Sequence, residues 1–403
     1  MNIMRLLSAC LLLIAATSAQ DVAVHGDLIH TMAGETISDG IVLVQDGKIT
    51  AVGPAASVSV PDGVRVLRAA VVTPGLVDAH TVVGLAGYLN QDTDQDQLDQ
   101  SDPMQPELRA IDGYNARERL VEWVRGFGVT TIHTGHGPGK LISGQTMIAK
   151  TRGNTVDDAV IVPVAMIAAT IGETANEESE SKSPRTRSKQ VAMLRAELVK
   201  AREYRDGMSA DEDDRPDRDL RLEALARVLD RELPLLMTVQ RHNDIATALR
   251  LAEEFNLRLI LDGAAEAYLV LEEIRAAGVP VIIHPTMMRA WGEMENLALD
   301  TAASLAASGI PFALQSGFED YVPKTRVILY EAGVAAAFGL GSEAALASIT
   351  IDAARLLGID DRVGSLEVGK DGDIALYDGD PLEYTTHCVG VLIEGAVVSE
   401  ETR

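Results

Sequence analysis

The chain has 403 residues, 47% of them hydrophobic and 24% charged, so it can bury a large core and is long enough for one large domain and one small one. Its formal net charge is −25. Phosphate groups would repel such a chain, which excludes nucleic acid and anionic membrane surfaces as expected partners. The composition indicates a soluble globular protein.

The N-terminus has the pattern of a secretory signal peptide. Arg5 precedes an apolar run from Leu6 to Ala16, and the small residues that follow allow cleavage after Ala19. The run is too short for a stable membrane span. We therefore predict a signal peptide over residues 1–19, no membrane anchor, and a periplasmic or secreted mature chain. Lipidation of Cys10, which follows Leu-Ser-Ala, stays open as an alternative to ordinary cleavage.

Short β-type runs occur near both ends of the chain. Between residues 22 and 70, the runs Ile41–Val44 and Ile49–Val52 flank the dipeptide Asp46-Gly47, which is typical of a hairpin turn. The C-terminal stretch repeats this pattern over residues 373–395. We expect the two ends to supply strands to one small antiparallel unit.

The middle of the chain alternates buried-type runs with segments of helical length. This alternation predicts parallel strand pairing, and seven runs with 146–150 as a candidate eighth favour a β/α barrel. An open doubly wound sheet is the alternative, but no Gly-x-Gly-x-x-Gly opens a helix. The runs are 70–76, 129–133, 160–167, 235–239, 257–261, 279–283 and 311–314, and the helical segments include 192–204, 220–231, 245–256 and 267–277.

A run ending in histidine follows the first strand of this region. Pro74-Gly75-Leu76-Val77-Asp78-Ala79-His80 is followed by Thr81 and Val82. Alternate residues at a strand end point the same way, so a His-x-His pair there could seat one metal ion. Here the second histidine position holds Val82, which has no lone pair to offer.

On the basis of these residues, the chain resembles the amidohydrolase superfamily, and more narrowly its secreted, imidazolonepropionase-like branch. The resemblance covers nearly everything after the signal peptide. Its strongest motif is Ser365–Asp373, a recognisable ending of that family. The other matching stretches are 74–80, 102–113, 128–131 and 144–145.

The resemblance implies a fold and a chemistry. The fold is a distorted (β/α)8 TIM-type barrel over residues 71–364, with a composite β-sandwich built from 20–70 and 365–403. The chemistry is hydrolysis of carbon–nitrogen bonds other than peptide bonds, in cyclic amides or similar small substrates. One or two divalent metals, such as zinc, activate water in this family, and a strand-end aspartate moves the proton.

The family's metal-binding positions, carried onto this sequence one by one, have lost their donors except at His80. Glycine, alanine and valine cannot coordinate a metal, and one imidazole does not hold a catalytic divalent cation. We therefore expect a degenerate metal site, no catalytic residue, and a cofactor implied by resemblance only. The substituted positions are Val82, Ala168, Thr238, Gln240, Gly263 and Gly317.

A relocated metal site is the alternative to loss. His133, His136 and His284 lie near predicted strand ends, and in barrel order the strands of His284, His80 and His133 are near neighbours. These histidines could join His80 around a metal, although no carboxylate is placed to act as base. Asp262 could hydrogen-bond a ligand, as could Glu266.

Three functions follow from these observations. The first is a catalytically impaired or silent amidohydrolase-like protein that binds a small molecule or assembles with an intact homologue, as a homo- or hetero-oligomer. The second is an active secreted hydrolase that uses a relocated metal site. The third is a ligand-binding scaffold without a partner. Metal content separates the second from the others.

Overall fold

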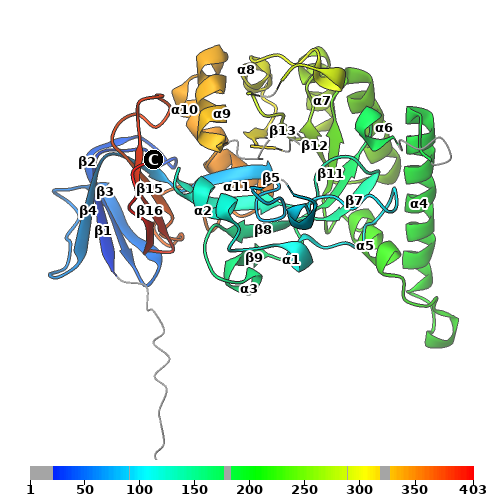
Figure 1. Cartoon of the computed structure of the whole chain (residues 1–403), viewed down its shortest axis with the longest axis horizontal. Helices are drawn as coiled ribbons and strands as arrows, with labels where there is room; N and C mark the ends of the chain where they lie inside the picture. The colour runs from blue at the N-terminus through cyan, green and yellow to red at the C-terminus, as the bar shows by residue number, and fades with distance from the viewer. Residues whose placement is uncertain (1–20, 90, 177–182, 288, 318–326) are drawn as a thin grey trace, which may run out of the picture.

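The computed structural model describes residues 21–89, 91–176, 183–287, 289–317 and 327–403 (Figure 1). The predicted signal peptide and Cys10 lie outside these ranges. None of the helices within them is both long enough and apolar enough to cross a membrane.

The strands fall into three sheets. They are β1 (Val22–Ile29), β2 (Ile37–Gln45), β3 (Lys48–Pro54), β4 (Arg65–Pro74), β5 (Leu76–Thr81), β6 (Val129–Thr134), β7 (Ile142–Gln145), β8 (Met147–Lys150), β9 (Val160–Val162), β10 (Ile167–Thr170), β11 (Leu235–Val239), β12 (Leu259–Gly263), β13 (Val281–Ile283), β14 (Phe312–Leu314), β15 (Ile374–Tyr377), β16 (Cys388–Ile393) and β17 (Ala396–Ser399).

The helices surround the central strands. They are α1 (Ala110–Gly113), α2 (Arg119–Arg125), α3 (Val156–Ala159), α4 (Arg187–Gly207), α5 (Leu220–Leu229), α6 (His242–Phe255), α7 (Leu271–Ala277), α8 (Thr301–Ala307), α9 (Ile328–Ala335), α10 (Ser342–Ser348) and α11 (Ile351–Leu357). Short turns of helix are η1 (Asp92–Asp94), η2 (Glu173–Ala175), η3 (Glu212–Asp214), η4 (Ala267–Leu269), η5 (Gly292–Met294) and η6 (Ala336–Leu340).

Strands from both ends of the chain form one seven-stranded sheet, at the left of Figure 1, in the order β17-β16-β15-β4-β1-β2-β3. The predicted hairpin is present: β2 and β3 pair antiparallel, and both turn residues, Asp46 and Gly47, have positive φ. That conformation is the one a two-residue hairpin turn requires. The predicted composite unit is therefore a sheet, and the expected boundary after residue 70 falls within β4.

The central strands make a TIM-barrel-like arrangement of two sheets. One has the order β14-β13-β12-β11-β10-β7, and its strands β10 to β14 are parallel; the other has the order β5-β6-β8-β9. A single bridge between Thr81 and Gly317 joins β5 to the end of β14. Within the described residues, the ladders do not close into one continuous barrel sheet.

Side chains that alternate along the barrel strands pack into two separate hydrophobic cores. Leu236, Ile260 and Ile282, on neighbouring parallel strands, pack with Val77 and Ile148 in one cluster inside the arrangement. The residues on either side of Leu236 pack in a different cluster, which includes the helices. This period of two is what parallel strands with a filled interior and helix-covered exterior require.

Two predicted strands are placed differently from expectation. The run 70–76 ends β4 of the seven-stranded sheet, and the barrel strand is β5, because Pro74-Gly75 separates the two. The run 160–167 divides into β9 and β10, since Pro163 lacks the N–H that a central strand needs. The other five runs, and residues 146–150, each contain a strand that overlaps the predicted range.

A buried ion network connects the barrel to the small sheet. Nζ of Lys150, at the end of β8, lies 2.6 Å from Asp373 Oδ2 and 3.1 Å from Asp371 Oδ2. All three side chains are buried. Lys48 also reaches Asp371, at 2.6 Å, and Arg362 does so at 3.0 Å. The C-terminal Asp-Gly-Asp segment is therefore fixed to the barrel wall.

Candidate functional site

A small cavity lies at the carboxyl ends of the barrel strands. It offers ≈ 30 Å³, room for about one or two water molecules. This end of the strands is where barrel proteins place their active sites. The cavity is lined by His80, Thr81, Val82, Pro138, Thr238, Gln240, Asp262, Gly263, His284, Pro285, Gln315 and Gly317.

His80 and Asp262 form a buried pair in this cavity. His80 Nδ1 lies 3.0 Å from Asp262 Oδ1, so Nδ1–H donates to the carboxylate. Burial opposes charge on both groups, yet the carboxylate raises the pKa of His80 above its ordinary value, and the imidazole lowers the pKa of Asp262. His80 Nε2 is buried and has no hydrogen-bond partner among the described residues. The pair thus leaves one ring nitrogen available to the cavity.

Asp262 is also held by two neighbouring strands. Thr238 Oγ1 donates to Oδ2 at 2.6 Å, and Gln315 Nε2 donates to Oδ1 at 2.8 Å. Because His80 comes from β5, Thr238 from β11 and Gln315 follows β14, one carboxylate crosslinks four strand ends. The carboxylate has a fixed orientation as a result.

Asp78 supports the junction between β5 and β14. Its Oδ1 accepts hydrogen bonds from the Ser316 backbone N–H at 3.0 Å and the His80 backbone N–H at 3.3 Å. Burial raises the pKa of Asp78 to about 7, although these hydrogen bonds act in the opposite direction. Ser316 Oγ also donates to Thr81 Oγ1 at 2.9 Å. Side chains therefore strengthen a junction that has one backbone bridge among the described residues.

His284 presents its second ring nitrogen to the cavity. Its Nδ1 lies 2.9 Å from the Pro285 carbonyl oxygen, so Nδ1–H is the donor and Nε2 is an acceptor. Nε2 is buried without a partner in the described part of the chain. Burial lowers the pKa of His284, which keeps the ring neutral. Two imidazole Nε2 atoms, from His80 and His284, thus belong to one cavity lining.

The other two candidate histidines lie outside the lining of this cavity. The ring of His133 is 5.5 Å from that of His80, but His133 Nδ1 donates to the Ala79 carbonyl at 2.6 Å and Nε2 accepts from Thr146 Oγ1 at 2.7 Å. Burial lowers the pKa of His133 to about 3. His136 packs against Gly144, and burial lowers its pKa to about 4.

Several positions carried over from the family lie together around the cavity. Val82, Thr238 and Gln240 line it, as do Gly263 and Gly317, whereas Ala168 does not.

The two glycines have backbone conformations that disfavour the expected ligands. Gly263 has φ +78°, and Gly317 has φ +72°. A Cβ added to Gly263 would lie 2.5 Å from Gln240 Nε2, and one added to Gly317 would lie 2.5 Å from Pro285 Cγ. A histidine or aspartate there would be strained and crowded.

The residues present do not fit a catalytic divalent metal. Such a metal has three protein ligands in most sites, whereas this lining offers two free imidazole nitrogens and a carboxylate already engaged by three donors. Across the described ranges, no group of three or more His, Cys, Asp or Glu side chains is placed to hold a metal ion.

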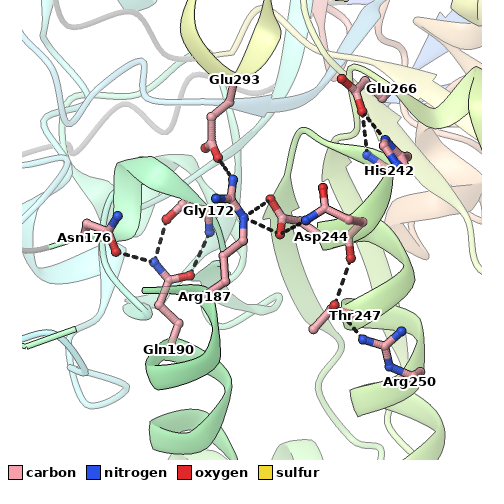
Figure 2. Close-up of polar contacts among 11 residues, drawn as sticks. Gly172, Asn176, Arg187, Gln190, His242, Asp244, Thr247, Arg250, Glu266 and Glu293 are labelled. Atoms are coloured by element: carbon pink, nitrogen blue, oxygen red, sulfur yellow. Dashed lines mark hydrogen bonds and ion pairs between the residues drawn. The ribbon is translucent and has the colours of Figure 1, made fainter. Parts of the chain in front are cut away.

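Glu266 and His242 form a separate pair at the start of α6 (Figure 2). The buried Glu266 carboxylate accepts from the His242 backbone N–H at 2.9 Å and from Nδ1 at 2.6 Å. Asn296 Nδ2 donates to the other oxygen at 2.8 Å. Glu266 thus satisfies the helix start and holds the segment that carries Asn296. It does not line the cavity.

Sequence reasoning named Asp262 as a possible ligand contact but missed its pairing with His80. These residues are 182 positions apart, and nothing in a single sequence links them. Asp78, Gln315 and Ser316 were missed as supporting residues. Asp78 lies inside the motif Pro74–His80, and this position was the signal that the sequence offered for its role.

The fold and the cavity at its strand ends define the class as a TIM-barrel-like α/β protein. Comparisons with known proteins give the family. The model of the amidohydrolase family matches residues 339–399. A solved amidohydrolase from Thermotoga maritima superposes with a TM-score of 0.88 at 27% identity, over 94% of this chain and 100% of that one. The chain belongs to the amidohydrolase superfamily.

Curated relatives agree with this placement. Amidohydrolase tasK of Hapsidospora irregularis is 25% identical over 400 residues, which are 88% of this chain and 39% of that protein. The imidazolonepropionase of Stenotrophomonas maltophilia is 34% identical over 106 residues, 26% of this chain and 25% of that enzyme. The chain thus spans about two fifths of the first relative and matches a quarter of the second.

Proposed function

We propose that this protein is an amidohydrolase-superfamily member that has lost metal-dependent hydrolysis and works by binding a small polar molecule at the barrel mouth, with one polar group of that molecule in the ≈ 30 Å³ cavity. Its lineage hydrolyses non-peptide carbon–nitrogen bonds. The observation that carries the proposal is the lining of the mouth cavity. Within the described part of the chain, His80 and His284 are its only imidazoles, and positions expected to hold further ligands hold Val82, Thr238 and Gly317.

The state of Asp262 supports the loss of catalysis. Three donors fix this carboxylate, and a carboxylate that is fully hydrogen-bonded in this way is a poor metal ligand or proton shuttle. Activating water without a metal would also require an electrophile for the scissile carbonyl, and among the described residues no cationic side chain lines the cavity apart from the imidazoles. The lineage's chemistry thus lacks its two main parts.

The available polar atoms support a binding role. Nε2 of His284 is an acceptor, and Nε2 of His80 faces the same cavity. Buried polar atoms without partners are costly, so a ligand or water that bonds them would be favoured. The lining also includes the side-chain amide of Gln240, which can donate to a ligand carbonyl.

Association and location are further parts of the proposal. A subunit without activity could still stabilise or complete an active amidohydrolase homologue, which fits the motif losses on an otherwise intact scaffold. The N-terminal signal pattern supports export to the periplasm or the medium.

Assays of turnover and binding test the proposal together. The protein, purified without chelator, is given cyclic amides, imides and N-acyl compounds with and without added Zn²⁺ or Mn²⁺, and its thermal unfolding is followed with the same compounds. We expect stabilisation by at least one compound and no turnover. Metal-dependent turnover that is lost in His80→Gln and His284→Gln would instead support the relocated metal site.

A further inference from the structure

A second concave site lies between α4 and α6, on the outside of the barrel. It offers ≈ 550 Å³, within the size range of small-molecule sites. Its lining shares no residue with the mouth cavity. Arg187 and Arg195 line it from α4, and Asn243, Thr247 and Arg250 line it from α6. We call it the α4–α6 groove.

Helical spacing explains why this groove is open and polar. Arg187, Val191 and Arg195 are four residues apart on α4, so they share one face of that helix. Asn243, Thr247 and Arg250 share one face of α6 for the same reason. The facing sides therefore offer little apolar area to bury against each other, and the helices do not close the space between them.

Two ion pairs hold the helices at this spacing. Arg187 Nε donates to both Asp244 oxygens, at 2.7 and 2.9 Å, and its Nη2 pairs with Glu293 (Figure 2). Farther along, Arg195 donates from Nε to Glu254 Oε1 at 2.7 Å and from Nη2 to Oε2 at 2.8 Å. Both pairs connect α4 to α6, so the groove walls have a defined separation.

Arg250 is the cation of the groove that lacks a carboxylate partner among the described residues. Its Nη2 donates to Thr247 Oγ1 at 2.8 Å, and that hydroxyl in turn donates to the Asn243 carbonyl at 2.8 Å (Figure 2). Thr247 orients the guanidinium without neutralising it. Most N–H donors of the Arg250 guanidinium stay available to a ligand.

The groove leaves one positive charge unpaired in an acidic chain. The chain has 60 acidic and 35 basic residues, whereas three arginines and one aspartate line the groove. Arg187 pairs with Asp244 and Glu293, and Arg195 pairs with Glu254, so Arg250 supplies the unpaired charge among the described residues. Donors thus outnumber free acceptors there. A guanidinium fork matches the two oxygens of a carboxylate or phosphate group.

We propose that the α4–α6 groove binds a small anionic molecule through a carboxylate or phosphate group. Arg250 donates two parallel hydrogen bonds to that group. The hydroxyl of Ser188, on the α4 side, provides a further donor. The site is independent of the proposed function of the mouth cavity.

Calorimetric titration of the full chain with citrate and with inorganic pyrophosphate, at constant low ionic strength, tests this proposal and separates the two oxyanion types. We expect one of them to bind with 1:1 stoichiometry and a Kd below about 1 mM. Arg250→Gln should weaken it about tenfold, the loss of one charge-assisted fork, and Arg250→Lys should weaken it less. The matched control is Arg227→Gln, which changes a partly exposed arginine of α5 that pairs with Glu232 outside the groove, and it should bind as the native chain does.

Two results would overturn the proposal. One is the absence of binding heat for both anions up to about 10 mM, where a site of this kind should be filled. The other is equal affinity in the native chain and Arg250→Gln, which would mean that any observed binding uses another surface.

Discussion

Replacing Lys150 with methionine removes the only buried cation at the junction of the barrel and the small sheet, among the residues that the structure describes. Lys150 is 0% exposed, and its partners Asp371 and Asp373 are 2% and 3% exposed. Breaking a buried ion pair on one side costs about 3–5 kcal/mol, because the remaining charge stays buried. With an unfolding entropy of about 2.1 cal/mol/K per residue, that loss lowers Tm by about 4–6 °C.

Lys48→Met is the matched control. Lys48 also binds Asp371, at 2.6 Å, but its side chain is half exposed, so its loss should cost under about 1 kcal/mol. The assay is thermal unfolding of both variants, of Asp373→Asn and of the double variant Lys150→Met/Asp373→Asn. The cost of the double variant should be smaller than the sum of the costs of Lys150→Met and Asp373→Asn. A cost below about 1 kcal/mol for Lys150→Met would contradict this role of Lys150, since it falls in the range of a surface pair.

Three further predictions concern the mouth of the barrel. Asp262→Ala leaves three buried donors without an acceptor and should cost about 3 kcal/mol in chemical denaturation, whereas a neutral effect would argue against the crosslinking role. Gly317→Asp restores the expected carboxylate, yet it should lower Tm and add no bound zinc in elemental analysis, because of its positive φ and its contact with Pro285. His133 has a pKa of about 3 when folded and 6.5 when unfolded. Its contribution to the free energy of unfolding is therefore complete above pH 6.5 and should fall by about 1.4 kcal/mol per pH unit between pH 6.5 and about 3. His133→Asn should reduce that slope in a pH series of unfolding curves, and an unchanged slope would contradict the assignment.

Local sequence patterns predicted where the strands lie better than which strands pair with each other. The run 235–239 is β11 as expected, because a β-branched and leucine-rich run of five residues favours a buried strand. The run 160–167 was divided by Pro163, a breaker that the hydrophobic pattern alone conceals. The expected sandwich is a seven-stranded sheet with β4 at its centre, and its pairing depends on long-range contacts that no local signal specifies.

The candidate site shows the same limit. His80 could be named from its motif, and the positions of Thr238 and Gly317 could be carried over from the family. The hydrogen bonds that fix Asp262 could not be predicted, since they join strands far apart in sequence. The positive φ of Gly263 and Gly317 was also hidden, because glycine is compatible with nearly any backbone conformation.

The proposed function rests on a mouth cavity that does not hold a catalytic divalent metal. The most direct test is elemental analysis of the mature protein, purified without chelator, incubated with Zn²⁺ or Mn²⁺ and freed of excess metal by gel filtration. We expect well under 0.1 equivalent of either metal per chain, because two imidazoles do not form a high-affinity site. One or two equivalents, reduced in His80→Gln, would contradict it.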